Sequence, residues 1–162
     1  MSGEKTITLR INGRHENTSV PPHRTLLEAL RELGHVEVKC GCEKGDCGAC
    51  AVLVDGVALD SCLMLAWMAE GHEITTVTGL GDAAAPHPLQ LAFSAGGGVQ
   101  CGYCTPGMII AAKSMLDRNP DPSEDDIRLG LSGNLCRCTG YTKIFEAVSE
   151  AAGRMRAGED SR

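Results

Sequence analysis

The sequence contains few aromatic residues, more acidic than basic residues and no long apolar run. The 162 residues include only two Phe, two Tyr and one Trp, so few large apolar side chains are available to fill one large core. We therefore expect two small domains. The formal net charge of -6 argues against a nucleic-acid partner. No stretch approaches the roughly 18 apolar residues of a membrane span, and the N-terminus lacks a signal-peptide core and a twin arginine. We therefore expect a cytoplasmic protein with no membrane span.

Cysteine, by contrast, is abundant. In a cytoplasmic chain, nine cysteines are metal ligands or catalytic thiols more readily than disulfides. Eight of them fall into two sets of four, with the spacings C-x4-C-x2-C-x11-C and C-x2-C-x31-C-x-C. The first spacing is that of plant-type 2Fe-2S ferredoxins. The candidate metal ligands are Cys42, Cys47, Cys50 and Cys62 in the first set and Cys101, Cys104, Cys136 and Cys138 in the second.

Glycines surround the first set and suit a loop that wraps a metal cluster. Gly41, Gly45 and Gly48 allow positive backbone dihedrals and let amides point at sulfur. A zinc loop is the competing interpretation, although zinc sites usually pair cysteines as two C-x2-C units and this set has one. Rieske ligation would require two histidines, and all five histidines lie away from the cysteine motifs. We expect these histidines to be solvated surface residues.

The second set stands directly before predicted helices. Cys101 and Cys104 precede Thr105, an N-cap candidate followed by proline, and the other pair precedes a further helix start. Free amides and the positive end of the helix dipole would stabilise thiolates there. A redox-active dithiol, as in thioredoxins, is the competing interpretation of C-x2-C at a helix start. It would leave Cys136 and Cys138 without a role.

Several residues near the two cysteine sets are not candidate ligands and need an interpretation of their own. Cys40 is the one unassigned thiol, and we expect it to be a small buried filler rather than a ligand. Arg137 stands between two candidate ligands, where it could bind a phosphate or balance the charge of an anionic cluster. Met108 and Met115 are seven residues apart on one predicted helix and are expected in its core.

Turn and capping signals organise the first half. Two tight-turn dipeptides, Asn-Gly and Asp-Gly, each separate two β-prone segments. Thr25 and Glu28 form a capping box before an apolar helical stripe that Gly34 ends. These signals predict a β-grasp ferredoxin-like domain over residues 1–79. Its expected strands are residues 6–11, 14–20, 51–54, 57–59 and 73–77.

The second half differs from the first in composition. Gly, Ala and Pro residues from Gly79 onward indicate a linker, and helical signals follow. We expect an all-α four-helix bundle over residues 80–162, which makes the whole chain α+β. The expected helices are residues 89–93, residues 105–116, a third capped by Ser123 with Asp126, and residues 142–156.

Four motifs in order resemble the iron-sulfur subunit of the molybdenum hydroxylases, the xanthine dehydrogenase family. The likeness covers nearly the whole chain. The motifs are Gly41-Cys-Glu-Lys-Gly-Asp-Cys-Gly-Ala-Cys50, Asp60-Ser-Cys-Leu63, Gln100-Cys-Gly-Tyr-Cys-Thr-Pro-Gly107 and Gly133-Asn-Leu-Cys-Arg-Cys-Thr-Gly-Tyr141.

The resemblance implies two 2Fe-2S clusters, one on each cysteine set. It implies that electrons run from a molybdopterin centre through the second cluster to the first and then to FAD. Gln100 and Cys138 match the positions that approach the pterin in this family. The implied partners are a large molybdopterin subunit and a medium FAD subunit, often in a dimer of heterotrimers.

Two other functions stay open beside this one. A stand-alone two-cluster ferredoxin-type electron carrier would account for the first half, and a zinc-stapled interaction module would account for the cysteines alone. The sequence contains no dinucleotide-binding fingerprint, no phosphate loop and no nucleophile with a base. We therefore expect an oxidoreductase subunit with no substrate chemistry on this chain alone.

Overall fold

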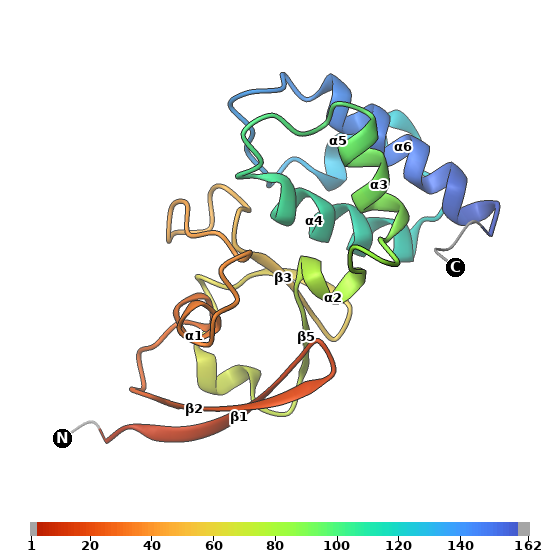
Figure 1. The fold of residues 1–162 in the computed structure, drawn as a ribbon. Coiled ribbons are helices and arrows are strands. Elements are labelled where there is room, and N and C mark those ends of the chain that lie inside the picture. Colours follow the sequence, from red (N-terminus) through yellow and green to blue (C-terminus); the bar gives the residue numbers. More distant parts are fainter. Residues whose placement is uncertain (1–2, 159–162) are drawn as a thin grey trace.

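A computed structural model describes residues 3–158 and divides them into a sheet-based half and a helical half (Figure 1). The first half holds a five-stranded sheet in the order β2-β1-β5-β3-β4. Helix α1 and the short 3-10 helix η1 complete this half. The elements are β1 (Lys5–Ile11), β2 (Arg14–Val20), α1 (Leu26–Glu32), β3 (Ala51–Val54), β4 (Val57–Asp60), η1 (Ala66–Ala69) and β5 (Glu73–Thr75).

Both predicted hairpins form around their Asn-Gly and Asp-Gly turns. Asn12 and Gly13 have φ values of 50° and 76°, and Asp55 and Gly56 have 49° and 83°. Positive φ at both central residues gives a turn whose twist matches that of the paired strands. In β1, Ile7 and its alternate neighbours are buried, as the period of two predicts. The turns therefore fix the register that buries the apolar face.

Helix α1 begins at the predicted capping box. The Thr25 side chain accepts a hydrogen bond from the Glu28 amide, and the Glu28 carboxylate accepts one from the Thr25 amide. Both bonds satisfy helix-end donors that would otherwise lack partners. The apolar face of α1 packs into the core of the sheet. That core includes Ile7, Leu9, Ile11, Leu26, Leu27, Leu30, Val52 and Ile74.

The predicted last strand is too long, and the predicted linker begins inside a short helix. Strand β5 ends at Thr75, and a one-turn helix, α2 (Val77–Leu80), follows where coil was expected. Thr76 ends the strand because its amide donates to Asn12 Oδ1 at 2.9 Å and its hydroxyl donates to Glu37 Oε1 at 2.8 Å. These contacts turn the chain away from the sheet towards the helical half.

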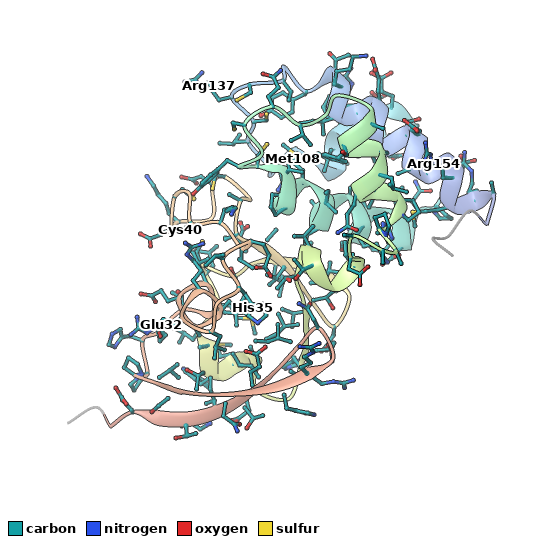
Figure 2. The ribbon with its side chains drawn as sticks, viewed as in Figure 1. Glu32, His35, Cys40, Met108, Arg137 and Arg154 are labelled. Atoms are coloured by element: carbon teal, nitrogen blue, oxygen red, sulfur yellow. The ribbon has the colours of Figure 1, made fainter. Side chains whose placement is uncertain are left out.

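Four helices with their own apolar core make up the second half. They are α3 (Pro88–Ala95), α4 (Thr105–Arg118), α5 (Glu124–Gly130) and α6 (Thr142–Arg156). Met108 and Met115 lie in this core as predicted, and Figure 2 labels Met108 on α4. His87 is only 8% exposed, so the expectation of a solvated histidine is wrong there. Its side chain accepts from the Leu89 amide at 3.2 Å and caps α3.

The two halves meet where α4 packs beside strands β3 and β4. Ile110 of α4 packs with Ala51 and Leu53 of β3 in a small joint cluster. The buried Ser114 hydroxyl accepts a hydrogen bond from the Ala58 amide of β4 at 3.1 Å. Strand β4 is at the edge of the sheet, so helix α4 occupies part of that edge. The α+β fold predicted from the sequence is confirmed, and within residues 3–158 no helix is long and apolar enough to cross a membrane.

Candidate metal centres

The first cysteine set lies on the loop between α1 and β3 and on the turn after β4. Cys42 and Cys47 are partly exposed, whereas Cys50 and Cys62 are buried at 3% and 6% exposure. The β3–β4 hairpin brings Cys62 next to Cys50 because it returns the chain to the start of β3. The buried Ser61 hydroxyl donates to the Cys50 carbonyl at 2.7 Å and holds the two segments together.

The fold brings together sulfurs of the same cysteine set. In the first set, the thiols of Cys42 and Cys47 shift each other's pKa, and the Cys62 thiol shifts the pKa of Cys50. In the second set, Cys138 Sγ donates to Cys101 Sγ at 3.6 Å, and the Cys136 thiol contributes to the raised pKa of Cys104. Within residues 3–158, no group of three or more His, Cys, Asp or Glu is arranged to hold a single metal ion.

Amides converge on Cys42 and lower the pKa of its thiol. Hydrogen bonds from the amides of Lys44 and Asp46 lower the pKa of Cys42 to about 7. The Asp46 amide lies 3.3 Å from Cys42 Sγ. Burial has the opposite effect deeper in the site, where it raises the pKa of Cys50 to about 12. Amides that point at sulfur stabilise a thiolate and an anionic cluster alike.

An acidic side chain beside the first site was missed in the sequence. The Cys50 thiol donates to Asp60 Oδ1 at 3.7 Å, and burial raises the pKa of Asp60 above its ordinary value. Asp60 is the last residue of β4 and lies opposite Ala51 in the hairpin register. Its place in the Asp-Ser-Cys-Leu motif was the only available signal.

Glycines leave room for the first loop to close on itself. A Cβ at Gly41 would lie 2.7 Å from Cys47 Sγ, so only glycine allows this approach. Gly45 and Gly48 have φ values of 79° and 65°, as the sequence predicted for a wrapping loop. A Cβ at Gly45 would also lie 2.5 Å from Leu63 Cδ1. Four soft sulfur donors, inward amides and a loop shaped by glycine together fit an iron-sulfur cluster.

The second set is built on the N-terminus of α4 and on the loop before α6. Cys104 is the N-cap residue of α4, but its side chain makes no capping hydrogen bond. Burial and contact with Cys136 raise the pKa of Cys104 to about 12. Burial also raises the pKa of Cys136, but hydrogen bonds from the hydroxyl and amide of Thr139 outweigh it and lower the pKa overall. The Cys136 amide donates to the Tyr141 hydroxyl at 2.9 Å, which ties this loop to the start of α6.

The predicted helix-terminus stabilisation is therefore correct only in part. Only Cys104 lies directly at a helix start, as the N-cap of α4. Three residues separate Cys101 from the start of α4, and three separate Cys138 from the start of α6. Tyr141 has a φ of 71°, and this left-handed residue turns the chain into α6. Local contacts with Thr139, rather than the helix dipole, stabilise the thiolate form of Cys136.

The surface around the second set is open, while the inner half of the first set is closed. Gln100, Cys101 and Cys138 are exposed, and Arg137 points outward from its loop (Figure 2). Cys40 is also exposed, so the prediction of a buried filler is wrong. Its Sγ donates to Glu43 Oε1 at 3.3 Å, which raises the pKa of the Cys40 thiol. The Cys40 carbonyl accepts from Tyr103, which bridges to the helical half.

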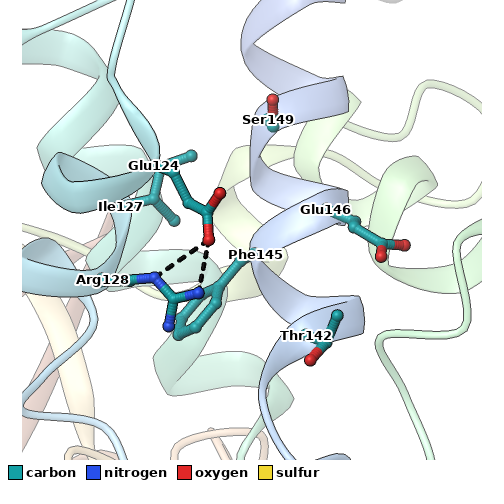
Figure 3. A pocket seen from close by; sticks show the side chains of 7 residues that line it. All are labelled: Glu124, Ile127, Arg128, Thr142, Phe145, Glu146 and Ser149. Atoms are coloured by element: carbon teal, nitrogen blue, oxygen red, sulfur yellow. Dashed lines mark hydrogen bonds and ion pairs between the residues drawn. The ribbon is translucent and has the colours of Figure 1, made fainter.

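One groove lies away from both cysteine sets, between α5 and α6 (Figure 3). Its volume is about 370 Å³. Arg128 crosses it, donating to Glu124 Oε1 at 3.1 Å while its guanidinium lies 4.9 Å from the centre of the Phe145 ring. It contains no cysteine, and we assign it no part in the metal chemistry. Its lining residues are Glu124, Ile127, Arg128, Thr142, Phe145, Glu146 and Ser149.

Two protein families match the chain and divide it between them. A 2Fe-2S iron-sulfur cluster binding domain matches residues 9–76, and a 2Fe-2S binding domain matches residues 76–149. The nicotinate dehydrogenase small FeS subunit of Eubacterium barkeri is 48% identical over 150 residues, covering 92% of this chain and 96% of that protein. The chain belongs to the iron-sulfur subunits of the molybdenum hydroxylases.

Other relatives in this family are about as long as this chain or much longer. The xanthine dehydrogenase iron-sulfur-binding subunit of Escherichia coli O157:H7 is 48% identical over 152 residues, covering 91% of this chain and 96% of that protein. The crystal structure of quinoline 2-oxidoreductase from Pseudomonas putida 86 contains a chain with a TM-score of 0.91 and 45% identity, with 98% and 99% coverage. The aldehyde oxidoreductase of Megalodesulfovibrio gigas is 44% identical, but this chain covers only 17% of it. The family predicted from the four motifs is confirmed.

Proposed function

We propose that this iron-sulfur subunit carries electrons between two partner subunits through two 2Fe-2S clusters. The donor would be a molybdopterin centre on a large subunit and the acceptor an FAD on a medium subunit, in a dimer of heterotrimers. The gathering of eight cysteine thiols at two sites, four at each, carries this proposal. A two-iron cluster takes two thiolates on each iron, so four thiols suit one cluster.

Each site would be formed by one of the predicted cysteine sets. When bound, a 2Fe-2S cluster accepts and releases one electron at a time. The chain supplies the thiolates, the amides around Cys42 and the closed environment of Cys50. The first site would use Cys42, Cys47, Cys50 and Cys62, and the second Cys101, Cys104, Cys136 and Cys138.

Exposure at the second site supports the approach of the large subunit that the family resemblance implies. Cys101, Cys138 and Gln100 are all exposed. We propose that Gln100 and Cys138 approach the pterin of the large subunit from this surface. Electrons would then leave through the first site, on the other half of the chain.

We also propose that the chain consists of two domains, residues 1–79 and 80–162. Two separate apolar cores support this division. Helix α2 lies at the junction, where Val77 and Leu80 pack against both the helical core and the joint cluster of Ala51, Leu53 and Ile110. All nine cysteines are free thiols, which is consistent with a reducing, cytoplasmic compartment.

Metal analysis and electron paramagnetic resonance test the proposal. We expect about four iron and about four acid-labile sulfide per chain, with two distinct signals after reduction. Cys104→Ser should disturb one signal and spare the other, whereas Cys42→Ser should do the reverse. Zinc without sulfide would refute the proposal. Purification from the native cell should yield a large molybdopterin chain and a flavin chain in complex, and native mass spectrometry should give two copies of each chain.

A further inference from the structure

A buried amide joins the first cysteine loop to the loop that carries the second set. Asn134 is 6% exposed, and its Nδ2 donates to the Gly48 carbonyl at 3.1 Å. Gly48 lies between the ligand candidates Cys47 and Cys50, and Asn134 lies two residues before Cys136. The contact thus joins two segments that are 86 residues apart in the sequence. A buried carbonyl–amide bond of this kind is costly to break, because the acceptor loses a partner that water cannot replace.

Neighbouring backbone contacts reinforce this junction. The Leu135 amide donates to the Cys47 carbonyl at 3.0 Å. Asn134 is itself held to the end of α5, because its amide donates to the Leu131 carbonyl at 2.9 Å. The Gly48 carbonyl also accepts from the Ala51 amide at 3.2 Å, so the start of β3 is tied to the same point. The loop is therefore held between its own strand and the helical half.

Glycines on both sides allow the two backbones to approach. A Cβ at Gly107 of α4 would lie 2.1 Å from the Gly48 carbonyl oxygen, which excludes any larger residue without movement. A Cβ at Gly48 would lie 2.4 Å from Asn134 Nδ2. Figure 1 shows the loop before β3 lying beside the start of α4. The first loop is thus packed against the helical half at both Gly107 and Asn134.

We propose that Asn134 is a positioning residue that fixes the first metal site relative to the second. The proposal rests on the proposed function, in which each cysteine set holds a cluster. Asn134 provides no ligand. Its amide holds the Gly48 carbonyl and so sets where the loop of Cys47 and Cys50 lies with respect to Cys136. This contact keeps the separation between the two sites constant. The separation matters because the rate of electron transfer between two centres depends steeply on their distance.

Asn134→Ala and Asn134→Asp test the proposal in the purified complex. The first removes the amide, and the second keeps its size but cannot donate as a carboxylate. Hydrogen–deuterium exchange at the amides of Ala51 and Leu135 should become about tenfold faster in both variants. The magnetic splitting between the two reduced centres should change, because it depends on their separation. Gly107→Ala presses on the same carbonyl from the other side and should give both changes.

Gly133→Ala is the matched control. It changes the neighbouring residue of the same loop, and no atom lies within 4 Å of the added Cβ. Exchange and splitting in this variant should equal those of the wild-type complex. The proposal is overturned if the Asn134 and Gly107 variants behave as Gly133→Ala does. A lack of iron and sulfide in the wild-type chain would instead refute the proposed function, and the exchange rates would still decide the role of Asn134.

Discussion

Replacement of Asp60 by Asn should raise the reduction potential of the first centre. The carboxylate oxygen of Asp60 lies 3.7 Å from Cys50 Sγ. Two unit charges at that distance interact by about 4 kcal/mol at an effective dielectric constant of about 20. An added electron is spread over a whole cluster, and Asp60 is partly open to solvent, so we expect about 1–2 kcal/mol. For a one-electron couple this is about 40–90 mV, towards a higher potential in Asp60→Asn.

The same carboxyl should make that potential depend on pH. Burial raises the pKa of Asp60, so the group is neutral at low pH and charged above its raised pKa. The wild-type potential should therefore fall as pH rises through this pKa, because a negative charge appears beside the centre. Asp60→Asn has no such charge, and its potential should stay nearly constant over the same range.

Redox titration of the complex, followed by electron paramagnetic resonance at several pH values, measures both effects. Asp125→Asn is a suitable control, because Asp125 is an exposed residue in the first turn of α5. It removes one negative charge without touching either cysteine set. An Asp60→Asn potential equal to or below that of the control would refute the electrostatic argument. An unchanged pH slope would show that another group carries the proton.

Three further outcomes follow from the local geometry. Gly45→Ala forces a residue with φ of 79° to carry a Cβ that meets Leu63, so iron content at the first site should fall while the second signal stays intact. Thr25→Ala removes a helix cap and should lower the free energy of unfolding by about 1 kcal/mol in urea titrations. Hydrogen bonds from the Thr25 amide and hydroxyl lower the pKa of Glu28 below its ordinary 4.5, so its stabilisation is complete above that pH and lost as pH falls through the lowered pKa. Thr25→Ala should weaken this acid sensitivity. Ser114→Ala leaves an amide of β4 without its partner and should cost about 1–2 kcal/mol in the same urea titrations.

Local signals in the sequence predicted most elements of the fold. Asn12-Gly13 requires positive φ at both positions, and Thr25 with Glu28 can satisfy helix-end donors within four residues of chain. Such features depend on neighbours in sequence, so they can be recognised without tertiary contacts. The cysteine spacing belongs to the same class of local features. The prediction of two metal sites needed only the order and distance of cysteines along the chain.

Several of the errors and omissions involve contacts between distant segments. Thr76 ends β5 early because Asn12 and Glu37 bind it, and both lie far from it in sequence. His87 is buried because α3 packs onto the helical core. The role of Asn134 depends on Gly48, across 86 residues. No local pattern in the sequence predicts contacts of this range, although Asn134 belongs to one of the family motifs.

The contact between α4 and the edge of the sheet has a consequence for the order of folding. Strand β4 ends the sheet, and an open edge is a template for pairing with another chain. The residue that covers it, Ser114, lies 56 positions after its partner Ala58, so a growing polypeptide exposes this edge until α4 has been synthesised. We therefore expect helix α4 to protect the sheet of the first half from aggregation in addition to positioning Cys104. A fragment of residues 1–79 should therefore self-associate at concentrations at which the full chain stays monodisperse.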